Sequence, residues 1–444
     1  MANSNEDSQG LAVPRQRLTR LARFGGLGAG IAGNMIADGA GKLARGERPD
    51  LQDLLLTPSN AAKVADQLSQ LRGAAMKLGQ LISMDAGDFF PPEFASVLAR
   101  LRSSAHAMPP HQLKTVLNDN WGRGWLKNFK RFDTRPIAAA SIGQVHRAQT
   151  KDGRTLAVKV QYPGVRRSID SDVDNVAALI KVSGLLPNGV DIAPLLDEAK
   201  RQLKQEADYE REGACLRRFG ALLADDHDFL LPQLDEALTT ENILSMEFMD
   251  GNPIETLSGA PQTVRDRVVS LLITLMMREL FDFRLMQTDP NFANYFYTDD
   301  AEKIVLLDFG ATREISEALS SGYRALLAAG LKSDWEVARA TAVTMGLMGD
   351  KSPESLETLM RETFQVIMEP IQENGTFDFG ATDIAVRLRD KGMALRTGGF
   401  HHVPPPATVF FHRKFGGVYL LASTLRARVN VGAIVRPYVT GSTT

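Results

Sequence analysis

The sequence predicts an α+β protein with two lobes, in which a short strand-rich part is flanked by longer helical parts. Strand patterns at Ala138–Ala148 and Thr155–Gln161 surround a turn at Lys151–Gly153. Helical periodicity prevails before and after them. The length of 444 residues suits two lobes with extensions. A hydrophobic content of 44% with 23% charged residues predicts a packed globular core.

Bulk properties narrow the class of protein. The net charge of -2 gives no global electrostatic case for nucleic acid as a partner. Cys215 stands alone, so no internal disulfide forms, which suits a reducing compartment. The first ten residues carry Glu6 and Asp7 and resemble neither a secretory signal nor a transit peptide. No run approaches the ~20 apolar residues of a membrane span. We therefore expect a cytoplasmic protein, or one held peripherally at the inner membrane.

The N-terminal part is expected to be helical. Residues 1–17 are predicted to form a disordered leader and residues 18–130 a helical extension. A helix over Leu18–Ile36 begins among four arginines, so it either rests on an anionic membrane surface or docks on the protein's own body. Its glycines are also compatible with a homodimer. Three further helices are expected over Ala61–Met84, Phe89–Arg100 and Pro110–Asn120.

The remainder divides into two predicted lobes. Residues 131–249 are expected to form a lobe with strands, and residues 250–444 a helical lobe. The first lobe should also contain helices at Ser168–Gly184 and Ile192–Leu223 and a strand at Ile243–Phe248. In the second we expect a helix at Val264–Phe283, a strand at Ile304–Leu307, and further helices interrupted by a loop at Pro404–Pro406.

Three polar residues in the second lobe carry the chemistry. Four residues separate Asp289 from Asn294, and a strand then ends in Asp308-Phe309-Gly310. This is the order that phosphoryl-transfer kinases use. Asp289 is expected to accept the proton of the nucleophile or to orient it. Asn294 and Asp308 are expected to hold Mg²⁺ through oxygen atoms. Asp-Phe-Gly also arises by chance, and Asp289-Pro290 also fits a plain turn. Whether these residues belong to a kinase site therefore depends on the residues upstream of them.

Lys159 is the first upstream residue of this set. Leu156-Ala157-Val158-Lys159-Val160 matches the kinase strand V-A-I-K, whose lysine reaches the α- and β-phosphates of ATP. The plain alternative is an edge-strand lysine that points outward. A buried lysine needs an anionic partner. The candidates on the following helix are Glu206, Asp208, Glu210 and Glu212, of which Asp208 and Glu212 share a face on a continuous helix.

The expected nucleotide loop is rich in alanine. Where kinases have G-x-G-x-x-G-x-V, this chain has A-x-A-x-x-G-x-V. Its residues are Ala138, Ala139, Ala140, Ser141, Gly143 and Val145. A Cβ atom at the first positions stiffens the loop and restricts its approach to phosphates. Further on, backbone groups near Glu247 and Met249 occupy the place of the hinge that holds adenine. The order of loop, lysine, glutamate and acidic motifs predicts a bilobal protein-kinase-like fold.

These motifs together resemble the UbiB family of atypical kinases, also called the aarF-domain or ADCK family. The resemblance rests on Lys77-Leu78-Gly79-Gln80, on the alanine-rich loop, and on Glu206-Ala207-Asp208. It covers most of the chain, from Leu18 to Pro437. The segment Gln287–Asn294 replaces the His-x-Asp-Pro-His-Pro-Gly-Asn of many members. That form, with His412–Gly417, resembles the branch that contains the mitochondrial protein needed for ubiquinone biosynthesis.

The resemblance implies roles for several residues. The helix with Lys77 and Gln80 would lie across the active site and fill the cleft for a protein substrate. Glu206 and Asp208 would anchor that helix and tune nucleotide or metal binding, and Glu212 would pair with Lys159. The implied cofactors are ATP/ADP and Mg²⁺. The implied activity is an ATPase or phosphotransferase that acts on a non-protein, lipid-pathway substrate.

The implied partners are an anionic membrane surface, an isoprenoid or phenolic lipid, and enzymes of ubiquinone biosynthesis. Two other functions stay open at this point. One is a nucleotide-binding scaffold that organises biosynthetic enzymes without turnover. The other is a conventional protein kinase, against which the alanine loop and the N-terminal extension argue.

Overall fold

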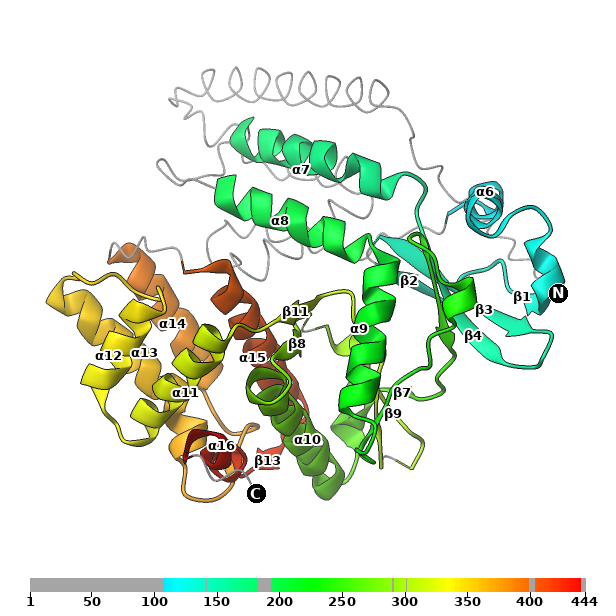
Figure 1. The fold of residues 1–444 in the computed structure, drawn as a ribbon. Helices are drawn as coiled ribbons and strands as arrows, with labels where there is room; N and C mark the ends of the chain where they lie inside the picture. Colours follow the sequence, from blue (N-terminus) through cyan, green and yellow to red (C-terminus); the bar gives the residue numbers. More distant parts are fainter. Residues whose placement is uncertain are drawn as a thin grey trace, which may run out of the picture. The chain divides into compact units, whose positions relative to one another are not determined.

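The computed structural model describes residues 108–140, 142–182, 193–289, 291–300, 302–398 and 404–440. The predictions for Lys77, Gln80 and Ser141, and for the helices before residue 101, lie outside these residues. The chain forms two compact units, which are described separately (Figure 1). The first holds the described residues up to Ala214 together with Gln233–Phe248. Residues Cys215–Pro232, which the sequence places in the first lobe, pack with the second unit.

The first unit is built on a five-stranded antiparallel sheet. Its strands are β1 (Phe129–Phe132), β2 (Ala138–Ala140), β3 (Gly143–Thr150), β4 (Thr155–Gln161) and β6 (Ile243–Glu247). The order is β1-β3-β4-β6, with β2 also paired to β3. The turn predicted between β3 and β4 is confirmed, and Gly153 adopts φ +97° there, which favours glycine.

The prediction of one strand over Ala138–Ala148 is wrong, because the chain reverses direction within it. Strands β2 and β3 form a hairpin in which Ala138 lies opposite Val145 and Ala140 opposite Gly143. A hairpin lets both segments form ladder hydrogen bonds in one sheet. The alternation of a single strand and that of a tight hairpin look alike over so few residues.

Along the chain, the helices of this unit either precede strand β1 or lie between strands β4 and β6. They are α6 (Pro110–Trp121), the 3-10 turn η1 (Trp125–Asn128), α7 (Val165–Val182), α8 (Ala193–Glu206) and α9 (Tyr209–Leu222). The single helix predicted over Ile192–Leu223 is therefore wrong. Asp208 stands between α8 and α9, and its Oδ1 accepts a hydrogen bond from the backbone N–H of Arg211 at 3.0 Å. An aspartate in that position caps a new helix instead of continuing the old one.

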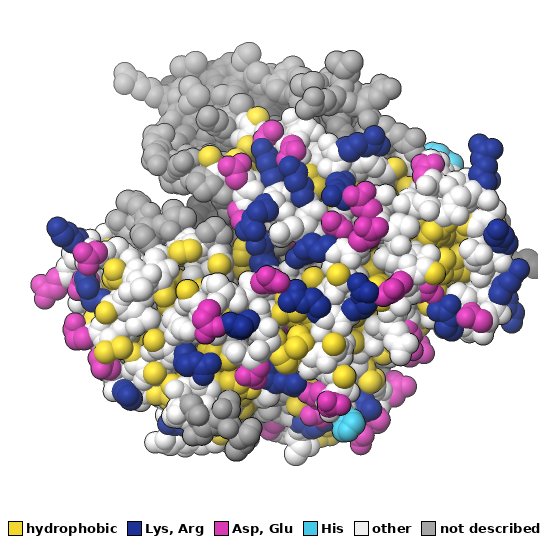
Figure 2. All heavy atoms as spheres, viewed as in Figure 1, with side chains coloured by type: hydrophobic (Ala, Val, Ile, Leu, Met, Phe, Trp, Pro, Cys, Tyr) yellow, Lys and Arg dark blue, Asp and Glu magenta, His cyan; other side chains and the backbone are white. Residues whose placement is uncertain are grey.

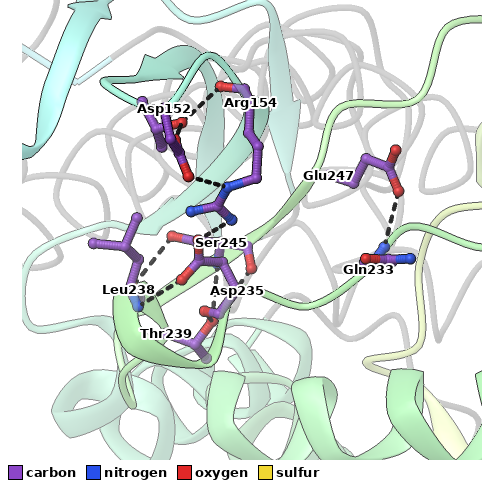
Figure 3. A network of polar contacts seen from close by, with 9 residues as sticks. Asp152, Arg154, Gln233, Asp235, Leu238, Thr239, Ser245 and Glu247 are labelled. Atoms are coloured by element: carbon purple, nitrogen blue, oxygen red, sulfur yellow. Dashed lines mark hydrogen bonds and ion pairs between the residues drawn. The ribbon is translucent and has the colours of Figure 1, made fainter.

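A polar network ties strand β6 to the turn between β3 and β4 (Figure 3). Asp235 is buried and accepts hydrogen bonds from Arg154 Nη1 at 2.7 Å and from the backbone N–H of Leu238 at 3.2 Å. The hydroxyl of Ser245 on β6 donates to the Leu238 carbonyl at 3.1 Å. A buried carboxylate with several donors is stable, so the network fixes β6 relative to the other strands.

Over its described residues, the second unit is mainly helical, with three small sheets. One sheet has the order β5 (Phe229–Leu230), β10 (Ile304–Leu306), β9 (Tyr295–Tyr297) and β7 (Asn252–Pro253). The others pair β8 (Leu285–Gln287) with β11 (Thr312–Glu314), and β12 (Phe377–Asp378) with β13 (Arg428–Val429). Two 3-10 turns are η3 (Ile254–Gly259) and η4 (Phe292–Asn294).

The helices of this unit follow the predicted pattern. They are α10 (Gln262–Phe281), α11 (Glu317–Leu331), α12 (Trp335–Thr344), α13 (Glu354–Gln372), α14 (Ile384–Thr397), α15 (Pro406–Thr424) and α16 (Val431–Thr440). The predicted elements Val264–Phe283 and Ile304–Leu307 are confirmed as α10 and β10. Pro406 opens α15, a position where proline's missing N–H costs little. Among the described residues, no helix combines the length and apolar character that crossing a membrane requires.

Candidate nucleotide and metal site

Lys159 forms a buried ion pair in the first unit. It lies on β4, which has β3 on one side and β6 on the other, so the edge-strand alternative is wrong. Its Nζ lies 2.9 Å from Oε1 and 3.2 Å from Oε2 of Glu212, whose side chain is 2% exposed. The ring of Tyr209 lies 5.3 Å from the same Nζ. A buried ammonium is stable in this setting because a carboxylate and an aromatic face compensate its charge.

The other three candidate partners have different surroundings. Glu206 is buried at the end of α8, and its Oε1 accepts a hydrogen bond from Gln202 Nε2 at 3.3 Å. Asp208 caps α9 and lies 4.0 Å from Arg166. Glu210 is exposed. Asp208 caps α9 and Glu212 lies in its first turn, where the Glu212 N–H donates to the Asp208 carbonyl at 3.1 Å. The continuous helix expected over both α8 and α9 therefore ends before Asp208.

The alanine hairpin lies beside Lys159 in the sheet. Ala138 and Ala139 are exposed and Ala140 is half-buried. Val145 of β3 is the direct cross-strand neighbour of Lys159. A Cβ atom on Gly143 would overlap the backbone oxygen of Val160 and lie 3.0 Å from the Tyr209 hydroxyl. Gly143 is thus required by close packing of β3 on β4, and the described residues of β2 are alanines, of which Ala138 and Ala139 are exposed.

The predicted adenine edge is partly occupied by bonds within the protein. The backbone N–H of Glu247 donates to the Gln233 carbonyl at 2.8 Å, and that of Phe248 to the Thr155 carbonyl at 3.0 Å. The Glu247 side chain accepts from Gln233 N–H at 3.4 Å (Figure 3). Met249 is half-buried and belongs to the second unit. Adenine binding by Glu247 and Met249 stays a prediction.

The second unit holds the three acidic-motif residues. Asp289 is half-buried, and its Oδ1 accepts a hydrogen bond from Asn291 N–H at 3.4 Å. Asn294 ends η4, and its carbonyl accepts the N–H of Leu307 at 3.1 Å, which ties it to the residue before Asp308. Asp308 Oδ1 accepts from Gly310 N–H at 2.9 Å. The local hydrogen bonds therefore hold both motifs in turns that begin where strands end.

The donor set fits Mg²⁺ as a partner of phosphates. Asn294 and Asp308 line one small cavity in this unit. The side-chain nitrogen of Asn294 is buried, and the described residues give it no hydrogen-bond partner. That nitrogen is a donor, so only the amide oxygen of Asn294 could ligate Mg²⁺. No group of three or more His, Cys, Asp and Glu among the described residues forms a complete metal site. Mg²⁺ does not need one, because it keeps waters and takes phosphate oxygens beside one or two protein ligands.

Lys414 on α15 is a buried lysine for which the sequence predicted no role. It contacts residues at both ends of the segment Gln287–Tyr295, which contains Asp289 and Asn294. Lys414 Nζ is 2.8 Å from the Tyr295 hydroxyl, 3.4 Å from Gln287 Oε1 and 3.3 Å from Glu279 Oε2. Glu279 Oε1 accepts the backbone N–H of Gln287 at 3.2 Å. Gln287 and Tyr295 flank the segment that contains Asp289 and Asn294. The lysine and glutamate therefore hold both ends of it.

The two charges stabilise each other. Burial lowers the pKa of Lys414, but Glu279 and Tyr295 outweigh it, so the pKa is raised overall. Burial raises the pKa of Glu279, and Lys414 opposes that rise. We conclude that Lys414 is protonated and that its charge favours the ionised form of Glu279, whereas burial is the larger effect and raises the pKa of Glu279 overall. The run His412–Gly417 was a signal in the sequence, but spacing does not reveal a partner 127 residues away.

A buried strand lysine paired with a helix glutamate, and a separate Asp–Asn–Asp set, define the class of kinase-like proteins that handle nucleotide phosphates. The chain belongs to the ABC1 atypical kinase-like domain family, whose profile matches residues 100–342. The expected place in the UbiB family is thereby confirmed.

Individual relatives agree with this assignment. The mitochondrial atypical kinase COQ8 of Saccharomyces cerevisiae is 36% identical over 96% of this chain and 85% of its own length. The mitochondrial atypical kinase COQ8B of Danio rerio is 35% identical over 96% of this chain and 68% of its own length. A solved structure of Rv3197 from Mycobacterium tuberculosis with erythromycin matches with a TM-score of 0.58 at 24% identity. It covers 85% of this chain and 96% of that one, and it shows the fold alone.

Proposed function

We propose that this chain is a Mg²⁺-dependent enzyme that hydrolyses ATP or transfers its phosphate to a non-protein substrate of ubiquinone biosynthesis. The observation that carries the proposal is the buried pair of Lys159 and Glu212. The pair places an ammonium group on a central strand next to β3, which forms a hairpin with the partly exposed strand β2, and phosphate binding requires an ammonium in such a place. The lipid pathway is supported by the similarity to COQ8 atypical kinases over nearly the whole chain.

Each residue has a stated role in this proposal. Lys159 would contact the α- and β-phosphates of ATP, and Glu212 would keep the Lys159 ammonium in place. Asn294 and Asp308 would hold Mg²⁺, which offsets the charge of the phosphates. Asp289 would accept the proton of the attacking hydroxyl or water, or orient that group. Glu206 and Asp208 would tune nucleotide or metal binding, as the resemblance implies, and backbone groups near Glu247 and Met249 would hold the adenine edge.

The acceptor is proposed to be water or a lipid-pathway compound and not a protein. Alanines stand at the exposed end of the β2–β3 hairpin where protein kinases have glycines. Their Cβ atoms restrict the backbone geometries that the hairpin reaches. The motif with Lys77 and Gln80 would in addition occupy the cleft for a protein substrate.

We further propose peripheral contact of the chain with an anionic membrane, through the arginines near residue 20. On the face seen in Figure 2, basic and acidic side chains intermingle over the described residues, so neither sign of charge dominates this face. Flotation of the full chain with liposomes that contain anionic lipid tests the idea. The variant with Arg15, Arg17, Arg20 and Arg23 changed to alanine should float less, and equal flotation contradicts the claim. The homodimer and contacts with other biosynthetic enzymes stay proposals.

Turnover of ATP tests the enzymatic proposal. The wild type should release phosphate only with Mg²⁺. Lys159→Met and Asp308→Asn should each lower kcat/KM by about two orders of magnitude or more, as removal of charge-stabilising groups does. Lys151→Met, at an exposed lysine in the turn before β4, is the matched control and should keep full activity. A chain that binds ADP but shows no hydrolysis with any liposome or lipid added overturns the proposal and favours the scaffold.

A further inference from the structure

The second unit contains a large cavity that the proposed ATP chemistry does not use. It has a volume of about 770 Å³ and is lined by residues from helices α10 to α16. Binding pockets for small organic molecules commonly have volumes of roughly 300–1,000 Å³. Protein interiors otherwise contain few voids larger than a water molecule. The cavity therefore has the size of a ligand site and not of a packing defect.

The lining is apolar and uncharged. Side chains such as Met276, Leu326, Phe364, Ile367 and Phe415 form its walls. None of the described residues that line it is Asp, Glu, Lys or Arg. A charged group moved from water into such surroundings loses its hydration and gains no counter-charge. The walls therefore select an uncharged molecule with a mainly hydrocarbon body.

A hydrogen-bonded polar pair lies within the apolar walls. The hydroxyl of Tyr323 on α11 and Nε2 of His412 on α15 lie 3.0 Å apart. The His412 ring is open to the cavity but is surrounded by protein, and this desolvation lowers its pKa to about 4. Burial raises the pKa of Tyr323. Both groups are neutral at pH 7, so the pair offers hydrogen bonding without charge.

Helix α15 exposes a stripe toward this space. His412, Gly416 and Leu420 recur every fourth residue, all three line the cavity, and Leu420 is 57% exposed. A Cβ atom added to Gly416 would meet no atom within 4 Å. The wall at Gly416 is thus open, and a larger side chain there would enter the cavity without disturbing the helix.

We propose that this cavity binds one small uncharged molecule, mainly hydrocarbon, with a single hydroxyl or carbonyl group that hydrogen-bonds to the Tyr323–His412 pair. The proposal rests on the cavity alone and does not require that the chain hydrolyses ATP.

Binding of Nile red, an uncharged dye that fluoresces in apolar surroundings, tests the proposal on the full-length chain. The dye should bind saturably with one molecule per chain. Decanol should displace the dye. Decanoate has a chain of the same length but carries a charge, so half displacement should need a concentration at least about tenfold higher than with decanol. Tyr323→Phe should lower the affinity for decanol by about fivefold, because a hydrogen bond is lost.

Two matched variants locate the bound dye. Gly416→Trp fills the cavity and should weaken dye binding at least about tenfold. Gly392→Trp on α14 is the control, because Gly392 also has no atom near its Cβ position, is exposed and does not line the cavity. It should leave binding unchanged. Equal binding by both variants, no saturable binding by the wild type, or equal displacement by decanol and decanoate overturns the proposal. Unchanged decanol affinity in Tyr323→Phe overturns the polar contact.

Discussion

Removing Lys414 should be among the most destabilising single changes in the second unit. The Lys414 and Glu279 side chains are 3% and 1% exposed, and Nζ and Oε2 lie 3.3 Å apart. Lys414→Met keeps the length of the side chain but leaves the Glu279 carboxylate buried without its cation. Breaking a buried pair in this way costs about 3–5 kcal/mol of unfolding free energy. A loss of this size is a large share of the stability of an ordinary domain.

The matched control is a pair on the surface. Lys391 Nζ lies 2.7 Å from Glu362 Oε2, with side chains 21% and 48% exposed. Lys391→Met should cost about 0–1 kcal/mol, because water already solvates both groups. Urea unfolding followed by circular dichroism compares the two variants with the wild type. Equal losses for the two variants would refute the reasoning from burial.

Acid should rescue Lys414→Met in part. Burial already raises the pKa of Glu279, and loss of the Lys414 charge removes the opposing effect. The folded variant therefore binds a proton at pH values where the unfolded carboxyl, with a pKa near 4.5, does not. Its stability relative to wild type should rise as pH falls from 8 towards 5. A deficit that is the same at both pH values contradicts an unpaired carboxylate as the cause.

Two further changes test packing and titration. Gly143→Ala should lower the free energy of unfolding by about 1–3 kcal/mol, because the added Cβ overlaps the Val160 carbonyl oxygen. In the same urea assay, the control Gly220→Ala on α9 should raise it by up to about 1 kcal/mol, because the added Cβ meets no atom within 4 Å. His412 has a folded pKa of about 4 against its usual 6.5, so the unfolded state takes up a proton first and stability should decline as pH falls between these values. His412→Gln should flatten that decline by about 1–2 kcal/mol, less than the full linkage because the ring is open to the cavity; an unchanged pH profile contradicts it.

Local patterns in the sequence identified most elements of the fold. The turn at Gly153, strand β4 and helix α10 follow from residue preferences and periodicity, which act over a few residues. The errors lie where a capping residue or a chain reversal interrupts a continuous pattern. Asp208 splits a predicted helix, and the β2–β3 hairpin splits a predicted strand. In each case the local hydrogen bonds decide whether the predicted helix or strand continues or ends. Hydrophobic periodicity does not report those hydrogen bonds.

The resemblance to a known family predicted the partner of Lys159 better than physical reasoning from spacing did. Helical spacing places Asp208 and Glu212 on one face but does not choose between them. The resemblance to UbiB proteins selects Glu212, which the structure pairs with Lys159. The sequence predicts that Gly143 belongs to a phosphate loop, whereas its packing against β4 explains the glycine. Lys414 was invisible because its partners come from α10, β8 and β9, and contacts so distant in sequence leave no local pattern.

Stability alone does not explain why the second unit contains the buried Glu279–Lys414 ion pair. Apolar residues of similar volume often replace a buried ion pair at no cost. The pair is directional, however: Glu279 fixes the N–H of Gln287, and Lys414 fixes Tyr295, on either side of Asp289 and Asn294. We therefore expect the double variant Glu279→Leu/Lys414→Met to regain most of the stability that Lys414→Met loses. We also expect it to lower kcat for ATP with little change in nucleotide affinity, since the acidic segment would lose its fixed position. A double variant that is both stable and fully active would show that the pair serves packing only.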